Sequence, residues 1–157
     1  MHKIQQKKMQ NIQGYNVRTD LLYDPSEGFW MEVHDATARI GYSPLVQETS
    51  GSFVALTLKK PGTHVAKGES FGSVEAEKHV GHLKAPVSGT IVAVNEKVMG
   101  TPRLLNDDPY GKGWLVEIEM SAPAVELPAL LSGEEAVAAW FESEIKKYKD
   151  KGWLAQP

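Results

Sequence analysis

The fold is decided by the stretch Ser70–Lys84, which reads SFGSVEAEKHVGHLK. Two runs of strand-forming residues, Ser70 to Ala76 and Val80 to Ala85, stand on either side of the dipeptide Glu77-Lys78. Extended runs joined by so short a polar connection indicate an antiparallel hairpin. If the two runs pair, the side chain of Lys78 stands at the tip of the hairpin and projects into solvent.

Similar short runs continue on both sides of this hairpin and are separated by turn residues. Lys59-Lys60-Pro61-Gly62 is one such turn signal, since proline and glycine both interrupt strands. The pattern predicts a small, mainly β sandwich or barrel. The further predicted strands lie at Trp30 to Val33, Ala36 to Ile40, Phe53 to Leu58, Thr90 to Asn95 and Trp114 to Glu119.

The C-terminal segment has a different hydrophobic period, in which apolar residues recur at helical spacing. This predicts a C-terminal α-helix over about residues 133–151. Its beginning is predicted by a capping box in Ser132–Glu135, and its end by Gly152. The apolar face of the helix packs either on the core or on a partner. Its members are Val137, Trp140, Phe141, Ile145 and Tyr148.

The length and composition of the chain restrict its class. At 157 residues it is long enough for one domain with a real core. We predict a flexible N-terminal tail over residues 1–16, which are polar and basic, and a single domain over residues 17–157. The sequence contains neither an export signal nor a run of apolar residues long enough to span a membrane, so we expect a cytoplasmic protein. A formal net charge of −3 argues against nucleic acid as the main partner.

Several kinds of chemistry are excluded or disfavoured. The chain has no cysteine, which excludes disulfides, thiolate nucleophiles and metal sites built on cysteine. Any redox or group-transfer role must therefore borrow its chemistry. No nucleophile elbow, phosphate-binding loop or dinucleotide fingerprint is found, so an autonomous enzyme is disfavoured. No metal site is predicted, because the histidines show no ligand spacing. This applies to four of the five histidines, namely His34, His64, His79 and His82.

Two glycines bracket the predicted hairpin. Gly62 precedes it, Gly89 follows it, and each stands next to turn-forming residues. Glycine enters backbone conformations with positive φ at little cost, so both positions are predicted kinks that support the hairpin. A rigid β module with one lysine on a protruding turn suits a modifying enzyme, which must reach the amine from all sides.

Three ordered segments resemble the glycine cleavage system H-protein family of lipoyl carriers. Phe71–Lys78 resembles the family's attachment strand, and Ala85–Asn95 resembles the strand that follows its hairpin. Pro102–Leu115 resembles its Pro-x-Leu-x-Asn and Asp-Pro-Tyr-Gly-x-Gly-Trp segment, and a looser likeness runs back to about Val17. The resemblance implies a lipoyl/biotinyl-type flattened β-barrel, a hybrid-motif sandwich, with short helices and a C-terminal α-helix.

The same resemblance implies a non-catalytic carrier, with lipoic acid amide-linked to Lys78 as a swinging arm. The arm would be attached by a lipoate ligase or lipoyl transferase. Glu75 matches a family position that the lipoylating enzyme reads, although a solvated strand carboxylate explains it equally well. Glu77 and His79 flank the lysine where biotin carriers have methionine, so biotin is disfavoured. His79 and His82 either act beside the arm or are simply exposed.

The pathway is less clearly indicated than the arm. Two short runs, Lys78–Gly81 and Lys84–Val87, resemble lipoate-binding proteins of heterodisulfide-reductase-like sulfur oxidation more closely. We therefore expect a heterodisulfide-reductase-like complex as partner. The alternative is the H protein of the glycine cleavage system, which carries an aminomethyl group between glycine decarboxylase, aminomethyltransferase and dihydrolipoamide dehydrogenase. A second alternative is an interaction module that has lost the modification.

Overall fold

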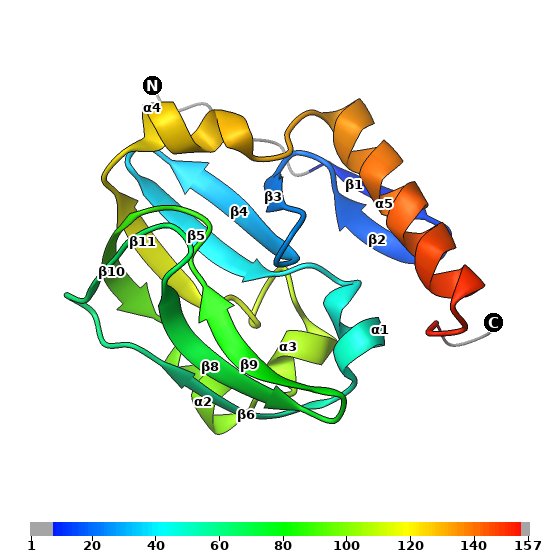
Figure 1. Cartoon of the computed structure of the whole chain (residues 1–157), viewed down its shortest axis with the longest axis horizontal. Coiled ribbons are helices and arrows are strands. Elements are labelled where there is room, and N and C mark those ends of the chain that lie inside the picture. The colour runs from blue at the N-terminus through cyan, green and yellow to red at the C-terminus, as the bar shows by residue number, and fades with distance from the viewer. Residues whose placement is uncertain (1–7, 155–157) are drawn as a thin grey trace.

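The structure is a computed structural model that describes residues 8–154 (Figure 1). Its strands form three antiparallel sheets with the orders β1-β2, β3-β4-β5-β11-β10-β7 and β6-β8-β9. Their bounds are β1 (Met9–Ile12), β2 (Tyr15–Arg18), β3 (Leu22–Asp24), β4 (Phe29–His34), β5 (Thr37–Tyr42), β6 (Phe53–Leu58), β7 (His64–Val65), β8 (Ser70–Ala76), β9 (His79–Lys84), β10 (Gly89–Val94) and β11 (Val116–Met120).

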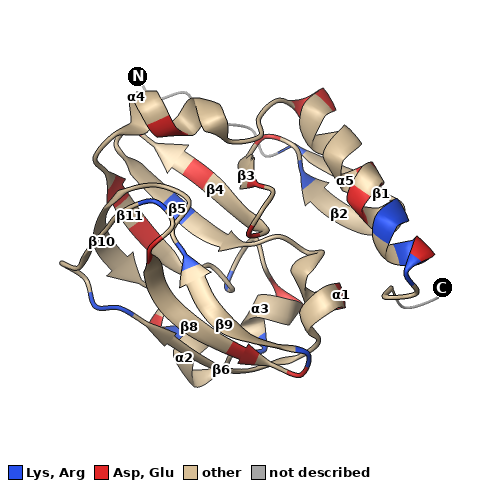
Figure 2. Ribbon diagram, in the orientation of Figure 1, with Lys and Arg blue, Asp and Glu red and all other residues tan. Residues whose placement is uncertain are grey.

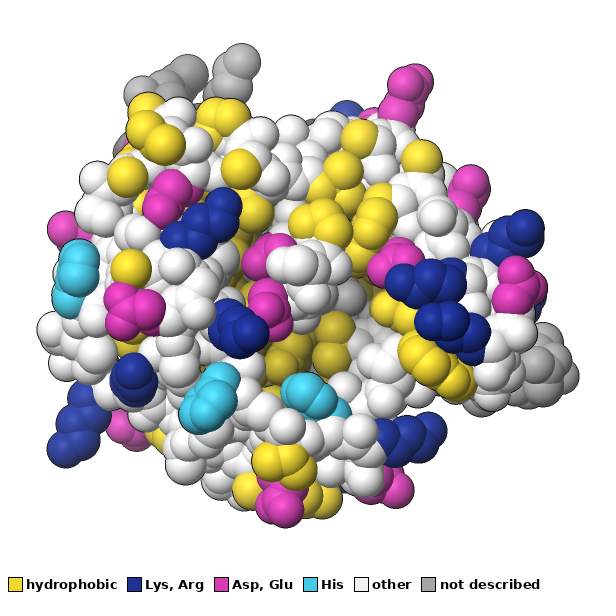
Figure 3. Space-filling model, viewed as in Figure 1, with side chains coloured by type: hydrophobic (Ala, Val, Ile, Leu, Met, Phe, Trp, Pro, Cys, Tyr) yellow, Lys and Arg dark blue, Asp and Glu magenta, His cyan; other side chains and the backbone are white. Residues whose placement is uncertain are grey.

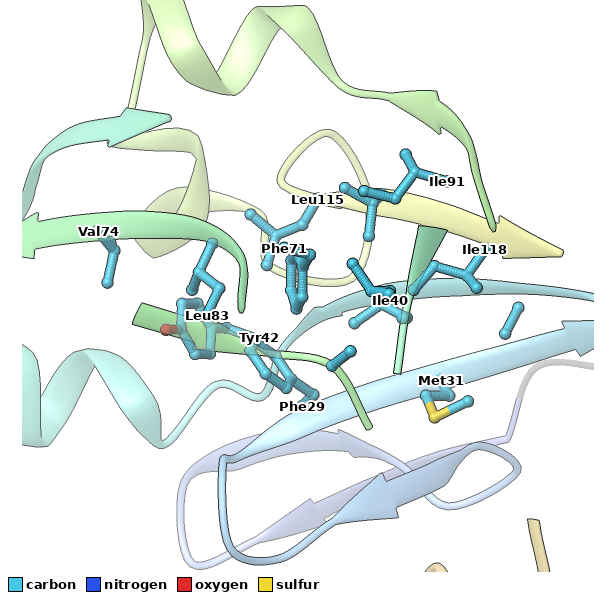
Figure 4. Packing of buried hydrophobic residues seen from close by; sticks show 14 of the residues in the cluster. Phe29, Met31, Ile40, Tyr42, Phe71, Val74, Leu83, Ile91, Leu115 and Ile118 are labelled. Carbon is cyan, nitrogen blue, oxygen red and sulfur yellow. The ribbon is translucent and has the colours of Figure 1, made fainter. Parts of the chain in front are cut away.

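The two larger sheets are packed face to face as a flattened sandwich. The sheets do not close on one another, so the predicted barrel is an open sandwich in the structure. Buried apolar side chains from both sheets fill the space between them (Figure 4). We call this cluster the sandwich core. Its fully buried members include Phe29, Met31, Ile40, Phe71, Leu83, Ile91, Leu115 and Ile118.

Strand β4 is buried on both of its faces. Phe29, Trp30 and Met31 are consecutive, and none is more than 1% exposed. Because successive strand residues point to opposite faces, Phe29 and Met31 enter the sandwich core while Trp30 points the other way. Trp30 belongs to a second buried cluster, the terminal cluster, which is built mainly from the two ends of the chain. Its members are Ile12, Val17, Leu21, Tyr23, Trp30, Leu45, Val137, Phe141, Ile145 and Leu154.

The helices are short except for the last one, which lies against β1 and β2 in Figure 1. This long helix is amphipathic and buries Val137, Phe141 and Ile145 in the terminal cluster, as its sequence period predicted. The helices are α1 (Val46–Ser50), α2 (Glu96–Gly100), α3 (Leu104–Asp107), α4 (Pro123–Glu126) and α5 (Glu134–Asp150), with a 3-10 turn η1 (Leu127–Ala129).

Helix α5 begins differently from the prediction. Gly133 occupies the N-cap position with φ of 95°, and no side chain caps the first turn, so the predicted capping box does not form. Glu134 and Glu135 lie in the first turn, and Lys147 and Lys149 in the last. This distribution places each charge at the end of the helix where the macrodipole favours it.

The N-terminal boundary of the ordered domain also differs from the prediction. The predicted tail covers residues 1–16, but β1 and the first half of β2 lie in its second half, and the two strands pair as a hairpin. The prediction of a flexible tail is therefore wrong for residues 9–16, and residues 1–7 lie outside the described residues. The hairpin is ordered because Ile12 and Val17 are buried in the terminal cluster, beneath α5.

A buried ion-pair network joins β2 to the six-stranded sheet. Arg18 Nη2 lies 2.6 Å from Asp20 Oδ2 and 2.9 Å from Glu32 Oε2, and the Arg18 side chain is only 4% exposed. Burial opposes ionisation of Glu32, but hydrogen bonds from His34 and Arg18 outweigh it, so the pKa of Glu32 is lowered. The Arg18 amide donates to the Tyr110 hydroxyl at 3.3 Å, which extends the network to the loop before β11.

Two features of the described residues bear on the classes of function considered above. No helix within residues 8–154 is long and apolar enough to cross a membrane. In the same part of the chain, no group of three or more His, Asp or Glu side chains is arranged to hold a metal ion.

Candidate functional site

Lys78 lies at the tip of the β8–β9 hairpin, as the sequence predicted. Ala76 pairs with His79, which leaves Glu77 and Lys78 as a two-residue connection. The Lys78 side chain is exposed, and no carboxylate of residues 8–154 lies within ion-pair distance of its Nζ. Its amine is therefore open to reaction with an enzyme that approaches from solvent.

The turn itself needs outside support. Neither Glu77 nor Lys78 has a positive φ, so the turn is not of the primed type that matches the twist of most two-residue hairpins. Contacts from another part of the chain hold it instead. The Lys78 amide donates to the Ser50 carbonyl at 2.9 Å, and the Glu77 amide donates to the Ser52 carbonyl at 3.1 Å. The backbone of the lysine is thus fixed although its side chain is free.

The side chain of Glu77 adds a third contact to this support. Its Oε1 accepts a hydrogen bond from the Ser52 amide at 2.8 Å. That hydrogen bond lowers the pKa of Glu77. Gly51 stands between the two serines with φ of 74°, and a Cβ there would meet Glu77 Cβ at 3.1 Å. We call the segment Ser50–Phe53 the hairpin brace.

The hairpin brace is in turn attached to α3 through Asn106. Its Oδ1 accepts from the Phe53 amide at 3.1 Å, and its Nδ2 donates to the Gly51 carbonyl at 3.0 Å. Asn106 lies in the Pro102–Leu115 segment that carries part of the family resemblance. Asn106 was therefore a signal of this support in the sequence. The backbone contacts of Ser50 and Ser52 left no such signal, because any residue has the same backbone atoms.

A groove of about 490 Å³ runs along β9 and ends near the hairpin tip. His79 and His82 line its hairpin side, and Trp140, Glu144 and Tyr148 of α5 line the opposite side. Figure 3 shows this face hollowed at its centre, with apolar side chains in the floor and histidines on the rim. Glu27 also lines the groove, and burial there raises its pKa against the opposing effect of Lys84.

A second hollow of about 590 Å³ adjoins the groove at the hairpin tip, and we call it the C-terminal hollow. Lys78 and His79 line it from the hairpin, and Gly152 and Trp153 from the turn after α5. Charged residues lie around both the hairpin tip and this end of α5 (Figure 2). Lys78 thus borders the C-terminal hollow, and His79 borders both the hollow and the groove.

Of the remaining predicted site residues, Glu75 lies on the hairpin and the two glycines lie outside it. Glu75 is exposed on the outer face of the three-stranded sheet, in register with Val80. Gly62 and Gly89 lie beyond the open end of the hairpin, away from Lys78. Gly62 has φ of 94°, and a Cβ at Gly89 would lie 2.1 Å from the Glu119 carbonyl oxygen. Both glycines are therefore required by the sandwich and do not border the lysine.

An open β-sandwich that presents an exposed lysine on a braced hairpin defines the class of lipoyl-carrier domains. Comparison with known proteins agrees. The family model described as "Glycine cleavage H-protein" matches residues 21–143. The chain therefore belongs to the glycine cleavage H-protein family, whose members carry lipoate on a lysine.

Individual relatives are similar over most of their length. A glycine cleavage system H protein of Carboxydothermus hydrogenoformans is 43% identical over 76% of this chain and 90% of its own. "Glycine cleavage system H protein 2" of Aquifex aeolicus is 32% identical over 92% of this chain and 88% of its own. The crystal structure of a glycine cleavage system H protein from Mycobacterium marinum superposes with a TM-score of 0.68 at 31% identity, covering 78% of this chain and 98% of that one.

These comparisons bear on the pathway that the sequence suggested. The names of these relatives refer to glycine cleavage, and none supports heterodisulfide-reductase-like sulfur oxidation. The expectation of a sulfur-oxidation complex thus finds no support, and its alternative, the glycine cleavage carrier, fits the relatives better. The runs Lys78–Gly81 and Lys84–Val87 that suggested sulfur oxidation are short, and they lie at the two ends of β9.

Proposed function

We propose that this chain is the H protein of a glycine cleavage system, and that it carries lipoate in amide linkage to Lys78. The observation that carries the proposal is the position of this lysine, exposed at a two-residue hairpin tip whose backbone is held by Ser50 and Ser52. Family membership supplies the lipoate, and the hairpin supplies the residue that accepts it.

The residues at the hairpin tip fit a lipoyl group. The Lys78 amine is accessible and has no ion-pair partner among the described residues, so acylation breaks no contact there and removes only the charge. The chain itself has no sulfur nucleophile, because it contains no cysteine. Lipoate supplies a pair of sulfurs for thiol and redox chemistry when it is attached. The protein's own contribution is to hold the base of the arm in place and to leave the rest of it free.

The partners follow from this role. A lipoate ligase or lipoyl transferase must first approach the tip, and exposed Glu75 with its register partner Val80 offers it a contact beside the lysine. Glycine decarboxylase, aminomethyltransferase and dihydrolipoamide dehydrogenase would then receive the arm in turn. A tether makes each of these encounters effectively intramolecular once the carrier has docked, which raises the local concentration of the carried group.

The attachment site is tested by intact mass. Protein incubated with lipoate, ATP and a lipoate ligase is expected to gain one lipoyl group, and Lys78→Arg is expected to gain none. Lys84→Arg is the matched control, because Lys84 is also exposed and lies on the same hairpin, at the far end of β9. Lipoylation of Lys78→Arg, or its loss in Lys84→Arg, would contradict the assignment.

The pathway needs a separate measurement. Fully lipoylated protein is expected to support glycine-dependent release of CO₂ by glycine decarboxylase, while Lys78→Arg is inactive. If the lipoylated protein is inactive in this assay and instead binds heterodisulfide-reductase-like subunits, the carrier role stands and the glycine cleavage assignment fails. Protein isolated from its own cells without any lipoyl group would favour the unmodified interaction module.

A further inference from the structure

The hairpin brace forms hydrogen bonds along both of its edges. The carbonyls of Ser50 and Ser52 accept from the two amides of the hairpin tip. The carbonyl of Gly51, which lies between them in the chain, instead accepts from Asn106 Nδ2. The brace therefore lies between the hairpin tip and α3, with hydrogen bonds to each.

Both polar atoms of the Asn106 side chain are used for the brace. Its Oδ1 accepts from the Phe53 amide, and its Nδ2 donates to the Gly51 carbonyl. A side-chain amide can accept and donate at the same time, so it matches a backbone edge that offers one N–H and one carbonyl. Aspartate at this position would lack the donor, and alanine would lack both groups.

Asn106 is itself held in place by the body of the protein. Its backbone amide donates to the Arg103 carbonyl at 2.9 Å. The preceding residue, Leu105, is 2% exposed and belongs to the sandwich core. A connected set of contacts thus runs from the sandwich core through α3 and the brace to the backbone of Lys78.

The turn at Lys78 depends on such support for its conformation. Neither of its two residues has a positive φ, and two-residue turns outside the primed types tend to splay the strands that they join. An enzyme that acylates the lysine has to bind the turn in one conformation. Time that the turn spends in other conformations lowers the concentration of protein that this enzyme can use.

We propose that Asn106 is a positioning residue for the acylation of Lys78, and that it acts through the hairpin brace. This rests on the proposed function. The side chain of Asn106 forms its hydrogen bonds with the brace and none with Lys78. It therefore changes the fraction of the protein whose turn is ready to bind, and it leaves the reaction in the bound complex unchanged. Its loss should raise the KM for the protein substrate and leave kcat as it is.

The kinetics of lipoylation test this directly. With a lipoate ligase, lipoate and ATP, the KM of Asn106→Ala is expected to be about three- to tenfold higher than that of the wild type at equal kcat, because two hydrogen bonds to the brace are lost. Asn95→Ala is the matched control. Asn95 is 5% exposed, and its side chain also holds backbone groups, the carbonyls of Lys112 and Trp114, but none in the brace. Whatever stability this control loses, its KM should equal that of the wild type.

Hydrogen exchange at single residues gives a readout that general destabilisation does not. The amides of Glu77 and Lys78 should exchange about three- to tenfold faster in Asn106→Ala than in the wild type. The amides of β10 and β11 should exchange at the wild-type rate. Asn106→Asp keeps the shape and the acceptor of asparagine but lacks its donor, and it should change KM and the exchange rates in the same direction.

The possible results separate this inference from the proposed function. An unchanged KM in Asn106→Ala, or a fall in kcat alone, would overturn the positioning role. Faster exchange at the hairpin tip without a higher KM would overturn it as well, and in each of these cases the carrier role stands. If the wild type gains no lipoyl group, it is the proposed function that fails, while the exchange rates still show whether Asn106 holds the turn.

Discussion

The sandwich core and the terminal cluster differ in which parts of the chain they unite. The sandwich core joins the two larger sheets, and it buries Phe71, Val74 and Leu83 of the attachment hairpin. The terminal cluster joins β1 and β2 to α5, so its strands and its helix come from opposite ends of the described sequence. The first region places Lys78, and the second builds the far wall of the groove and the turn that carries Trp153.

One region therefore supports the hairpin to which a group is attached, and the other supports surfaces that can accommodate that group. The hairpin is held by its own pairing with β6 and by the hairpin brace, neither of which includes a residue of the terminal cluster. The terminal cluster, by contrast, closes only when segments more than 100 residues apart meet, as in the ion pair of Lys8 with Glu134 at 3.4 Å. Elements of this kind are expected to open locally before the rest of a domain does.

Phe71→Ala is expected to destabilise the whole protein. Phe71 is fully buried between the sheets, with its ring centroid 5.5 Å from that of Phe29. Truncation of such a ring leaves a cavity and lowers the free energy of unfolding by about 3–5 kcal/mol. Urea denaturation measures the loss, and Phe71→Leu, which fills much of the space, should lose less. A loss below about 1 kcal/mol would mean that the sandwich core does not hold the sheets together.

Ile145→Ala is expected to act on the terminal cluster alone. Ile145 is fully buried beneath α5, so its truncation should cost about 2–4 kcal/mol in local stability. Amide hydrogen exchange should accelerate in residues 9–18 and 134–150 and stay slow in β8, and lipoylation of Lys78 should proceed as in the wild type. Glu142→Ala, at an exposed position of the same helix, is the control. Equal acceleration in β8 would show that the two regions unfold together.

The ion pair of Arg18 with Glu32 links the two regions, and its contribution to stability is expected to depend on pH. The pKa of Glu32 is lowered in the folded protein, so the stability it contributes is complete above the ordinary value of 4.5 and is lost as the pH falls through the lowered value. Glu32→Gln should lower the free energy of unfolding by about 1 kcal/mol at neutral pH. As the pH falls, the free energy of unfolding of this variant should decrease less steeply than that of the wild type. Urea denaturation from pH 7 to pH 3 measures both, with Glu119→Gln on the exposed side of β11 as control. Parallel pH curves for wild type and Glu32→Gln would contradict the role of this pair.

The features predicted from the sequence are those that a local pattern decides. The hairpin tip at Lys78 follows from two strand-like runs and a short polar connection, and α5 follows from a helical period of apolar residues. Gly152 ends the helix because only a residue tolerant of positive φ fits there. Ser132, in contrast, did not cap α5, because the chain enters the helix through Gly133.

The features that the sequence did not reveal depend on segments that meet only in the folded chain. The strand β1 reads as a polar tail because, of its residues, only Ile12 is buried, and it becomes ordered beneath α5. The hairpin brace acts largely through backbone atoms of Ser50 and Ser52, which leave no mark on residue type. The groove likewise unites β9 with Trp140 and Tyr148, and no motif connects them.

The hydrogen bond from the Lys78 amide to Ser50 has a geometric consequence for whatever is attached to the amine. With its Cα anchored, the side chain turns about a fixed pivot, and the far end of any extension stays within a sphere whose radius is the extended length of the arm. Enzymes that use the same carrier must therefore bring their catalytic centres within that sphere, each in its own orientation. A single serine carbonyl thus helps to fix the centre from which every partner is reached.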